Sequence, residues 1–299
     1  MNNHQTFYSN GKLLLTGEYV VLDGALALAI PTKFGQSLQV KTIIQPKIIW
    51  QSFDEKNNLW FEETFCLDLN DNPSNDISKR IIQILIAAKQ LNPKFLNTGI
   101  QVSTHLTFPR NWGLGTSSTL INNIAQWANV DAYKLLKQSF GGSGYDIACA
   151  QSNSSITYQL KHKIPMVAPV DFNPKFKDSL YFVYLNQKQN SRDGIAHYNN
   201  NKNNIGTIIQ NINSITLEMI NCRNLENFAQ LINRHETLIA NITKQETITS
   251  KYFPDFNGSI KSLGAWGGDF VLVAAAENPT NYFKEKGFDV VLRYNDMVL

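Results

Sequence analysis

Pro109-Arg-Asn-Trp-Gly113-Leu-Gly115-Thr-Ser117-Ser118 is the stretch of this sequence that says most about its fold. It follows a segment with strand-like alternation, Gly99 to Phe108, and precedes a segment with helical spacing, Ser117 to about Ala128. Glycines in such a turn let backbone N–H groups point at an anion, and the following helix adds its positive end. The three small hydroxyl residues at its end suit a helix start, a phosphate or Mg²⁺. By itself, the Gly-x-Gly pattern also fits an ordinary tight turn.

Three better-known glycine motifs do not fit this stretch. A Walker A loop is excluded because no Gly-Lys-Ser/Thr follows at the required spacing. The dinucleotide fingerprint is excluded because its third glycine is missing. A hydrolase elbow would read Gly-x-Ser-x-Gly, and neither Ser117 nor Ser143 has that setting.

Composition narrows the function classes further. The 299 residues are 43% apolar and 17% charged, which predicts a chain with a substantial core. The formal charge of +3, without a Lys/Arg tail, argues against a nucleic-acid partner. Three widely spaced cysteines without CxxC spacing suggest neither disulfides nor a zinc site. The polar first residues and strand-sized apolar runs predict a cytoplasmic protein without a membrane partner.

The pattern along the chain is typical of a mixed α+β protein. The first third is rich in strand-like segments, and Pro31 is expected to end the strand Ala25 to Ile30. The three prolines between Pro165 and Pro174 suggest a domain boundary, and the Asn-rich Asn199 to Asn204 a loop. Helical spacing predicts helices at 77–91, 131–138, 205–220 and 225–242, and apolar runs predict strands at 155–160, 180–185 and 270–276.

Four segments, in order, resemble one family. Besides the stretch quoted above, they are Gly11-Lys12-Leu-Leu-Leu-Thr-Gly17-Glu18-Tyr19, Gly144-Tyr145-Asp146-Ile147-Ala148 and Leu263-Gly264-Ala265-Trp266-Gly267-Gly268-Asp269. Together they resemble the GHMP kinases, named for galactokinase, homoserine kinase, mevalonate kinase and phosphomevalonate kinase. The matches span residues 11 to 269, nearly the whole chain.

The resemblance implies a two-domain α+β fold. Residues 1–165 would form an N-terminal nucleotide-binding domain like ribosomal protein S5, and residues 166–299 a ferredoxin-like C-terminal domain. It also implies ATP and Mg²⁺ as cofactors and a small-molecule substrate as partner, and it allows a homodimer.

The resemblance assigns roles to individual residues. The nucleotide would be bound by Pro109, Gly113, Leu114, Gly115, Thr116, Ser117 and Ser118, with the Ser117 hydroxyl also on the metal. The catalytic residues would be Asp146 and Lys12. The substrate would be bound by Glu18, Ser143, Gly144, Ser191, Arg192, Gly267 and Gly268.

Several of these assignments have a simpler alternative. Asp146 could cap a helix, Lys12 could be a solvated strand residue, and Arg192 could be a surface residue. The stretch between the loop and Asp146 is shorter than in mevalonate kinases. Ser118 to Ser143 holds one carboxylate, Asp131, which leaves the acidic Mg²⁺ ligand open. Trp266 stands where the family often has glycine, and packing over the loop or stacking near adenine are both open.

The motifs favour the phosphomevalonate branch, so the expected acceptor is mevalonate or 5-phosphomevalonate. A sugar or an amino-acid alcohol is the next enzyme reading, and a non-catalytic ligand-sensing protein is the alternative outside enzymes. The acceptor decides what Asp146 does. An alcohol holds its proton at neutral pH and benefits from a base, whereas a phosphate monoester is already largely ionised.

Overall fold

The computed structural model describes residues 4–187, 191–264, 266 and 268–299, and for Ser191 and Arg192 the backbone alone. The chain forms two compact units. Unit 1 consists of Met1–Gly11, Phe34–Arg110 and Leu114–Gln151, and unit 2 of Lys12–Lys33, Asn111–Gly113 and Ser152–Leu299. Residues 12–33, 111–113 and 152–165, which the sequence placed in the first domain, therefore lie in unit 2.

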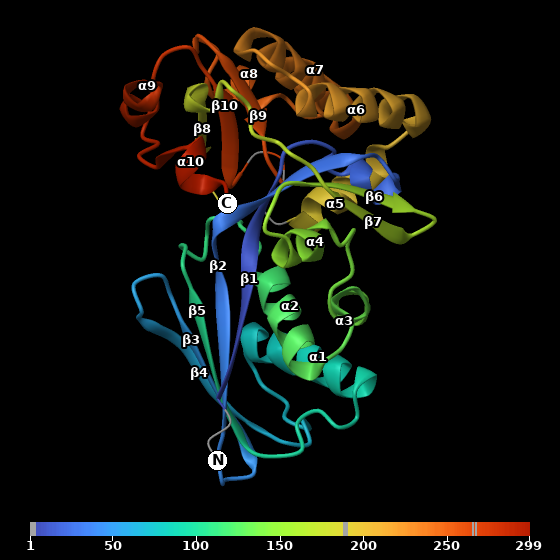
Figure 1. Cartoon of the computed structure of the whole chain (residues 1–299), viewed down its shortest axis with the longest axis vertical. Coiled ribbons are helices and arrows are strands. Elements are labelled where there is room, and N and C mark those ends of the chain that lie inside the picture. Colours follow the sequence, from blue (N-terminus) through green and yellow to red (C-terminus); the bar gives the residue numbers. More distant parts are fainter. Residues whose placement is uncertain (1–3, 188–190, 265, 267) are drawn as a thin grey trace. The chain divides into compact units, whose positions relative to one another are not determined.

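Unit 1 is a sheet with helices on one face (Figure 1). Its strands are β1 (His4–Leu14), β2 (Ala27–Thr42), β3 (Lys47–Phe53), β4 (Leu59–Cys66) and β5 (Ile100–Leu106), of which β1 and β2 continue into unit 2. They pair in the order β4-β3-β5-β2, with β1 beside β2. Its helices are α1 (Asp76–Leu91), α2 (Thr116–Ala128), α3 (Ala132–Ser139) and α4 (Tyr145–Gln151).

Alternation along the strands explains why one face of this sheet carries the helices. In β3, every second residue is buried, with Ile48 and Trp50 fully enclosed. In β5, Ile100 and Val102 alternate with partly exposed residues in the same way. The buried residues form one core with α1, α2, α3 and α4, so the start of α2 rests on a fixed layer.

Strand β2 is longer than the sequence suggested, and the prediction that Pro31 ends it is wrong. Residues 27–29 pair with β6 (Ile156–Lys161), and residues 36–42 pair with β5. Pro31 lies between these two stretches, where the strand changes partner. A missing backbone N–H is tolerated where the ladder is interrupted, so the strand continues through it.

Unit 2 is built on a four-stranded antiparallel sheet. Its strands are β8 (Leu180–Tyr184), β9 (Ser259–Ser262), β10 (Phe270–Ala274) and β11 (Val291–Arg293), paired in the order β11-β8-β10-β9. Counted along the chain, this is the order 4-1-3-2 of a ferredoxin-like sheet, as the resemblance implied. Unit 2 also holds the hairpin formed by β6 and β7 (Ile164–Pro169), a strand that the sequence did not reveal.

Unit 2 also contains helices. They are η1 (Val20–Asp23), η2 (Lys177–Ser179), α5 (Ser191–Asn201), α6 (Ile205–Ile220), α7 (Leu225–Thr243), α8 (Ile248–Tyr252), α9 (Thr280–Glu285) and α10 (Tyr294–Met297). Of these, α7, α8 and α10 pack against this second sheet. Helix α5 extends to Asn201, so the loop expected from Asn199 is partly wrong. The α+β fold class is confirmed, and α1, α6 and α7 match their predicted ranges to within one residue. None of the helices in the described residues combines the length and apolar character needed to cross a membrane.

Candidate functional site

Helix α2 begins without a side-chain cap. Gly115 occupies its N-cap position with a left-handed backbone (φ 97°), and Gly113 has φ 67°. Because glycine alone adopts such angles without strain, the sequence folds here into a tight turn. No acidic residue lies in the first turn of α2. By contrast, the starts of α1, α3 and α7 are capped by the side chains of Asn75, Asp131 and Asn224.

The hydroxyl residues at this helix start divide into two kinds. Ser118 is buried and its Oγ donates to the Gly115 carbonyl at 2.9 Å. Thr119 is buried and its Oγ1 contacts Gln36 Oε1 at 2.8 Å. Ser117 is exposed, and within the described part of the chain its hydroxyl makes no hydrogen bond. Ser118 and Thr119 therefore hold the turn, while Ser117 can receive a ligand.

Helix α4 carries Asp146 in its first turn, and it packs against α2 in the same unit. Gln151 Nε2 donates to Asn122 Oδ1 at 2.9 Å, which joins the end of α4 to the middle of α2. Three glycines with positive φ lead into α4: Gly141 (73°), Gly142 (104°) and Gly144 (90°). Ser143 between them is buried and Asp146 is half-buried.

Protein ligands for a metal are few. Among the described residues, no three His, Cys, Asp or Glu side chains gather in a way that could hold an ion. Asp131 Oδ1 accepts the N–H groups of Tyr133 and Lys134 at 2.8 and 3.0 Å and so caps α3. A closed protein cage does not fit these residues. A Mg²⁺ ion held mainly by phosphate oxygens and water, with the Ser117 hydroxyl as one ligand, does fit them.

Lys12, near the end of β1, contacts Gly113, which also belongs to unit 2. Its Nζ donates to the carbonyl oxygen of Gly113 at 3.1 Å, one of the three bonds that an ammonium group can donate. A Cβ atom at Gly113 would collide with the Asp269 carboxylate. A side chain is therefore excluded at Gly113 by close approach as well as by its backbone angle.

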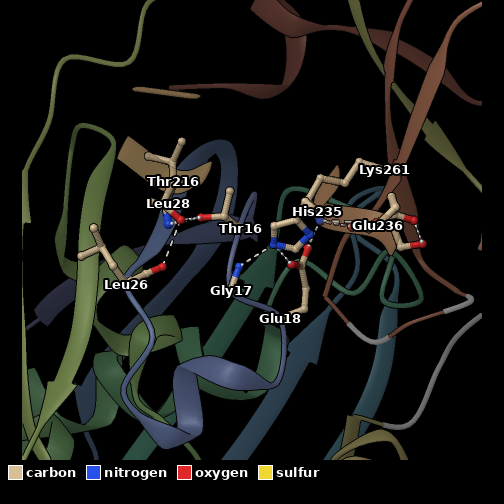
Figure 2. Close-up of polar contacts among 10 residues, drawn as sticks. Thr16, Gly17, Glu18, Leu26, Leu28, Thr216, His235, Glu236 and Lys261 are labelled. Atoms are coloured by element: carbon tan, nitrogen blue, oxygen red, sulfur yellow. Dashed lines mark hydrogen bonds and ion pairs between the residues drawn. The ribbon is translucent and has the colours of Figure 1, made fainter. Parts of the chain in front are cut away.

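Glu18 has no access to solvent. Its side chain lies in a buried cluster with His235, Glu236 and Lys261, which we call the buried quartet (Figure 2). Lys261 Nζ lies 2.5 Å from Glu18 Oε1 and 3.7 Å from Glu236 Oε1. The other oxygen of Glu236 accepts from Ser262 Oγ at 3.1 Å.

His235 in the quartet is neutral. Its Nε2 accepts the backbone N–H of Gly17 at 3.0 Å, so the ring proton sits on Nδ1. Burial, together with the charge of Lys261, lowers the pKa of His235 well below its ordinary value. Glu18 Oε2 lies 3.3 Å from His235 Nε2, and because the ring is neutral the two groups do not form an ion pair.

The two carboxyl groups share one ammonium group. Burial raises the pKa of Glu18, and Lys261 partly offsets that rise. Burial also raises the pKa of Glu236, to about 7, with Lys261 again opposing. One buried ammonium group thus faces two carboxyl groups, of which Glu236, whose pKa is raised to about 7, lies farther from it. The quartet fixes Gly17 and Glu18 to α7 and β9, so Glu18 supports its segment and contacts no solvent-borne ligand directly.

The predicted site residues divide between the two units. Unit 1 holds Pro109, Leu114, Gly115, Thr116, Ser117, Ser118, Ser143, Gly144 and Asp146. Unit 2 holds Lys12, Glu18, Gly113, Ser191, Arg192 and the buried Gly268. Gly267 lies outside the described residues, as do the side chains of Ser191 and Arg192. Trp266 is buried in the core of unit 2, which favours packing over exposure to an adenine ring.

Sequence reasoning missed three of the four quartet residues. Lys261 lies in β9, a four-residue strand whose Ser-Ile-Lys-Ser sequence has no strong apolar pattern. His235 and Glu236 lie in α7, where a polar pair suggests a solvated helix face. A weak signal was present in β9, because Lys261 lies two residues before the apolar Leu263 and three before residues 264–268, which we call the glycine-rich loop.

Comparisons with solved structures show the fold. The mevalonate kinase of Methanococcus jannaschii matches with TM-score 0.71 at 18% identity, covering 97% of this chain and 96% of that one. Streptococcus pneumoniae phosphomevalonate kinase, solved with phosphomevalonate and AMPPNP, matches with TM-score 0.72 at 15% identity over 97% and 99%. Lactococcus lactis galactokinase with galactose matches with TM-score 0.65 at 13% identity over 95% and 88%.

The chain therefore has the GHMP kinase fold over nearly its whole length. No family model matches the sequence, and no curated protein matches it either. The fold is also that of a mevalonate diphosphate decarboxylase from Staphylococcus aureus, with TM-score 0.63 at 12% identity over 98% and 96%. The fold alone thus leaves the reaction to be argued from the residues.

Proposed function

We propose that this chain is an ATP-dependent kinase that transfers the γ-phosphate to mevalonate or 5-phosphomevalonate. The observation that carries the proposal is the start of α2, where two left-handed glycines precede a helix end with no side-chain cap and no acidic residue. Free N–H groups and the helix dipole there favour a phosphate. The exposed Ser117 hydroxyl adds an oxygen ligand at the same place.

Positioning and neutralisation do most of the work in phosphoryl transfer. The turn around Gly115 would hold the terminal phosphates through backbone N–H groups, with Ser118 and Thr119 keeping its shape. Ser117 would provide one ligand to Mg²⁺, which would supply positive charge to the phosphate oxygens. Lys12, which contacts the Gly113 carbonyl, adds a second cation beside the loop.

Asp146 has a role that depends on the acceptor. As the new P–O bond forms and the bond to the β-phosphate oxygen breaks, ADP leaves. With mevalonate, the hydroxyl proton has to go to a base, and the half-buried Asp146 in the first turn of α4 is our candidate. With 5-phosphomevalonate, the attacking oxygen is already largely ionised, and Asp146 would orient cations instead.

The choice of acceptor rests on the motifs more than on the fold. Three segments are similar to the phosphomevalonate branch: Gly17-Glu18-Tyr19, Gly142-Ser143-Gly144-Tyr145-Asp146 and Gly267-Gly268-Asp269. Two of the structures with this fold are a mevalonate kinase and a phosphomevalonate kinase. Binding of the acceptor by Ser143, Gly144, Ser191, Arg192, Gly267 and Gly268 stays a prediction. The cytoplasmic location, the lack of a nucleic-acid partner and the formation of a homodimer also stay predictions.

The test is ADP release from Mg²⁺-ATP with mevalonate, 5-phosphomevalonate, galactose and homoserine as separate acceptors. We expect turnover with a mevalonate-pathway acceptor. Asp146→Asn should lower kcat about 10²- to 10⁴-fold if that acceptor is an alcohol, and much less if it is a phosphate. The control is Asp131→Asn, which keeps a good helix cap and should leave kcat unchanged. A folded, ATP-binding protein that turns over none of the four acceptors would contradict the proposal.

A further inference from the structure

Tyr19 is held in a backbone conformation that its residue type disfavours. It has φ 61° and ψ −50°, directly after Gly17 and Glu18 and at the N-cap of η1. A non-glycine residue with positive φ costs about 1 kcal/mol or more, so its surroundings must favour this conformation. The side chain is 8% exposed and lies in a core cluster with Tyr198 and Trp266.

The Tyr19 hydroxyl holds the glycine-rich loop. Its oxygen accepts the backbone N–H of Trp266 at 2.9 Å, in a buried setting. The Trp266 indole Nε1 donates to the Glu246 carbonyl at 3.1 Å, so the same residue is held at a second point. Burial raises the pKa of the Tyr19 phenol, and the group therefore stays neutral near neutral pH.

The Tyr19 ring holds α5. It stacks on Tyr198 with ring centroids 5.7 Å apart and an interplanar angle of 18°. Gly194 makes this approach possible, because a Cβ atom there would lie 2.6 Å from the Tyr19 oxygen. Tyr198 is fixed in turn, since its hydroxyl donates to Asp23 Oδ2 at 2.7 Å.

Both segments that Tyr19 contacts carry residues predicted to bind the acceptor. Helix α5 begins with Ser191 and Arg192, and the glycine-rich loop includes Gly268. The backbone that precedes Tyr19 is held in place by the buried quartet, because the Gly17 N–H donates to His235 and the Glu18 carboxylate contacts Lys261. A single side chain next to a fixed stretch of backbone thus contacts two segments of unit 2.

We propose that Tyr19 is a positioning residue for the acceptor, whose hydroxyl fixes the loop at Trp266 while its ring fixes α5. The identity of the acceptor rests on the proposed kinase function, whereas the contacts of Tyr19 with Trp266 and Tyr198 do not depend on that function. A bond from a buried N–H to Tyr19 is costly to lose, because the N–H is left without an acceptor. A loop released at Trp266 would bind the acceptor less tightly and leave the nucleotide unaffected.

Tyr19→Phe is the direct test, because it removes the hydroxyl and keeps the stacked ring. Tyr294→Phe is the matched control: it also removes a buried tyrosine hydroxyl from unit 2, one that donates to the Phe172 carbonyl at 3.1 Å. Two readouts are needed. The first is the hydrogen-exchange rate of the Trp266 backbone amide. The second is steady-state kinetics, which gives kcat and KM for the acceptor that the wild-type protein turns over and KM for ATP.

Tyr19→Phe should raise the Trp266 exchange rate about tenfold. It should also lower acceptor kcat/KM about tenfold, mainly through KM, with KM for ATP changed less than twofold. Tyr294→Phe should leave all three values within twofold of the wild type. Unchanged exchange in Tyr19→Phe, faster exchange with unchanged acceptor kcat/KM, or an equal loss in Tyr294→Phe would each overturn the proposal. If the wild-type protein turned over no acceptor, the proposed function would fail, and the exchange comparison would still decide whether Tyr19 holds the loop.

Discussion

The stretch Pro109 to Ser118 and the segment Gly17-Glu18-Tyr19 both resemble kinase motifs, but their polar groups lie in opposite environments. At the start of α2, the helix is uncapped and Ser117 is exposed. At Gly17-Glu18-Tyr19, the carboxylate, the backbone N–H of Gly17 and the phenol are all bonded inside unit 2. One motif therefore presents exposed polar groups, which we propose bind the nucleotide, and the other holds its polar groups inside the unit. Solvent access separates the two.

The largest expected effect comes from breaking the buried ion pair. Glu18→Ala leaves Lys261 charged and buried beside Glu236, and we expect it to lower the free energy of unfolding by about 3–5 kcal/mol. Urea denaturation measures this. The control is Glu218→Ala, which removes an exposed ion pair with Arg234 at 3.1 Å and should cost about 1 kcal/mol or less. Equal losses in the two variants would show that the quartet is no scaffold.

The next effect is a pH dependence of stability from Glu236. Its pKa rises from 4.5 to about 7 on folding, so its protonated form favours the native state. That contribution is complete below about pH 4.5 and is lost as the pH rises through 7, about 3 kcal/mol in all. Glu236→Gln should flatten the curve of unfolding free energy between pH 5 and 8. The control is Glu285→Gln, which replaces an exposed glutamate. A Glu236→Gln curve as steep as the wild-type curve would contradict the assignment of this pH dependence to Glu236.

A smaller effect separates the two serines at the start of α2. Ser117→Ala should lower kcat about tenfold without changing stability, because Ser117 makes no internal hydrogen bond in the described structure. Ser118→Ala should instead cost about 1 kcal/mol of unfolding free energy, since its Oγ donates to Gly115. Steady-state kinetics and urea denaturation on both variants check this. The reverse assignment of effects would show that Ser118, not Ser117, faces the ligand.

The smallest effect concerns Asp131. Because its carboxylate caps α3, Asp131→Ala should lower the unfolding free energy by about 1 kcal/mol. The Mg²⁺ concentration that gives half-maximal activity should not change. A strong increase in that concentration would make Asp131 the missing acidic ligand.

Most of the regular structure could be predicted from sequence, for reasons that particular elements make plain. Helices α1, α6 and α7 have strong helical periodicity, and their ends were found to within one residue. Strand β9 was missed because four residues carry too little pattern, and β7 because its prolines suggested a boundary. Pro31 was misread because a strand that changes partner can do without one N–H.

The glycine turn and the helix start after it could be predicted because they depend on local sequence: glycines, hydroxyls and the first helical residues lie within ten positions. The buried quartet could not, because Glu18 meets His235 and Lys261 across more than 200 positions of sequence. Ionisable residues of this kind are usually exposed, and only the fold reveals that these are enclosed. The contacts of Tyr19 with Trp266 and Tyr198 are long-range for the same reason.

One paired measurement tests the contrast between the two motifs most directly: the Kd for Mg²⁺-AMPPNP and the free energy of unfolding, on Ser117→Ala and Glu18→Gln. We predict that Ser117→Ala weakens nucleotide binding about five- to tenfold and leaves stability within about 0.5 kcal/mol. Glu18→Gln should lower stability by several kcal/mol and leave the Kd of the folded protein within about twofold. Nucleotide binding that is unaffected by Ser117→Ala but weakened by Glu18→Gln would contradict the account.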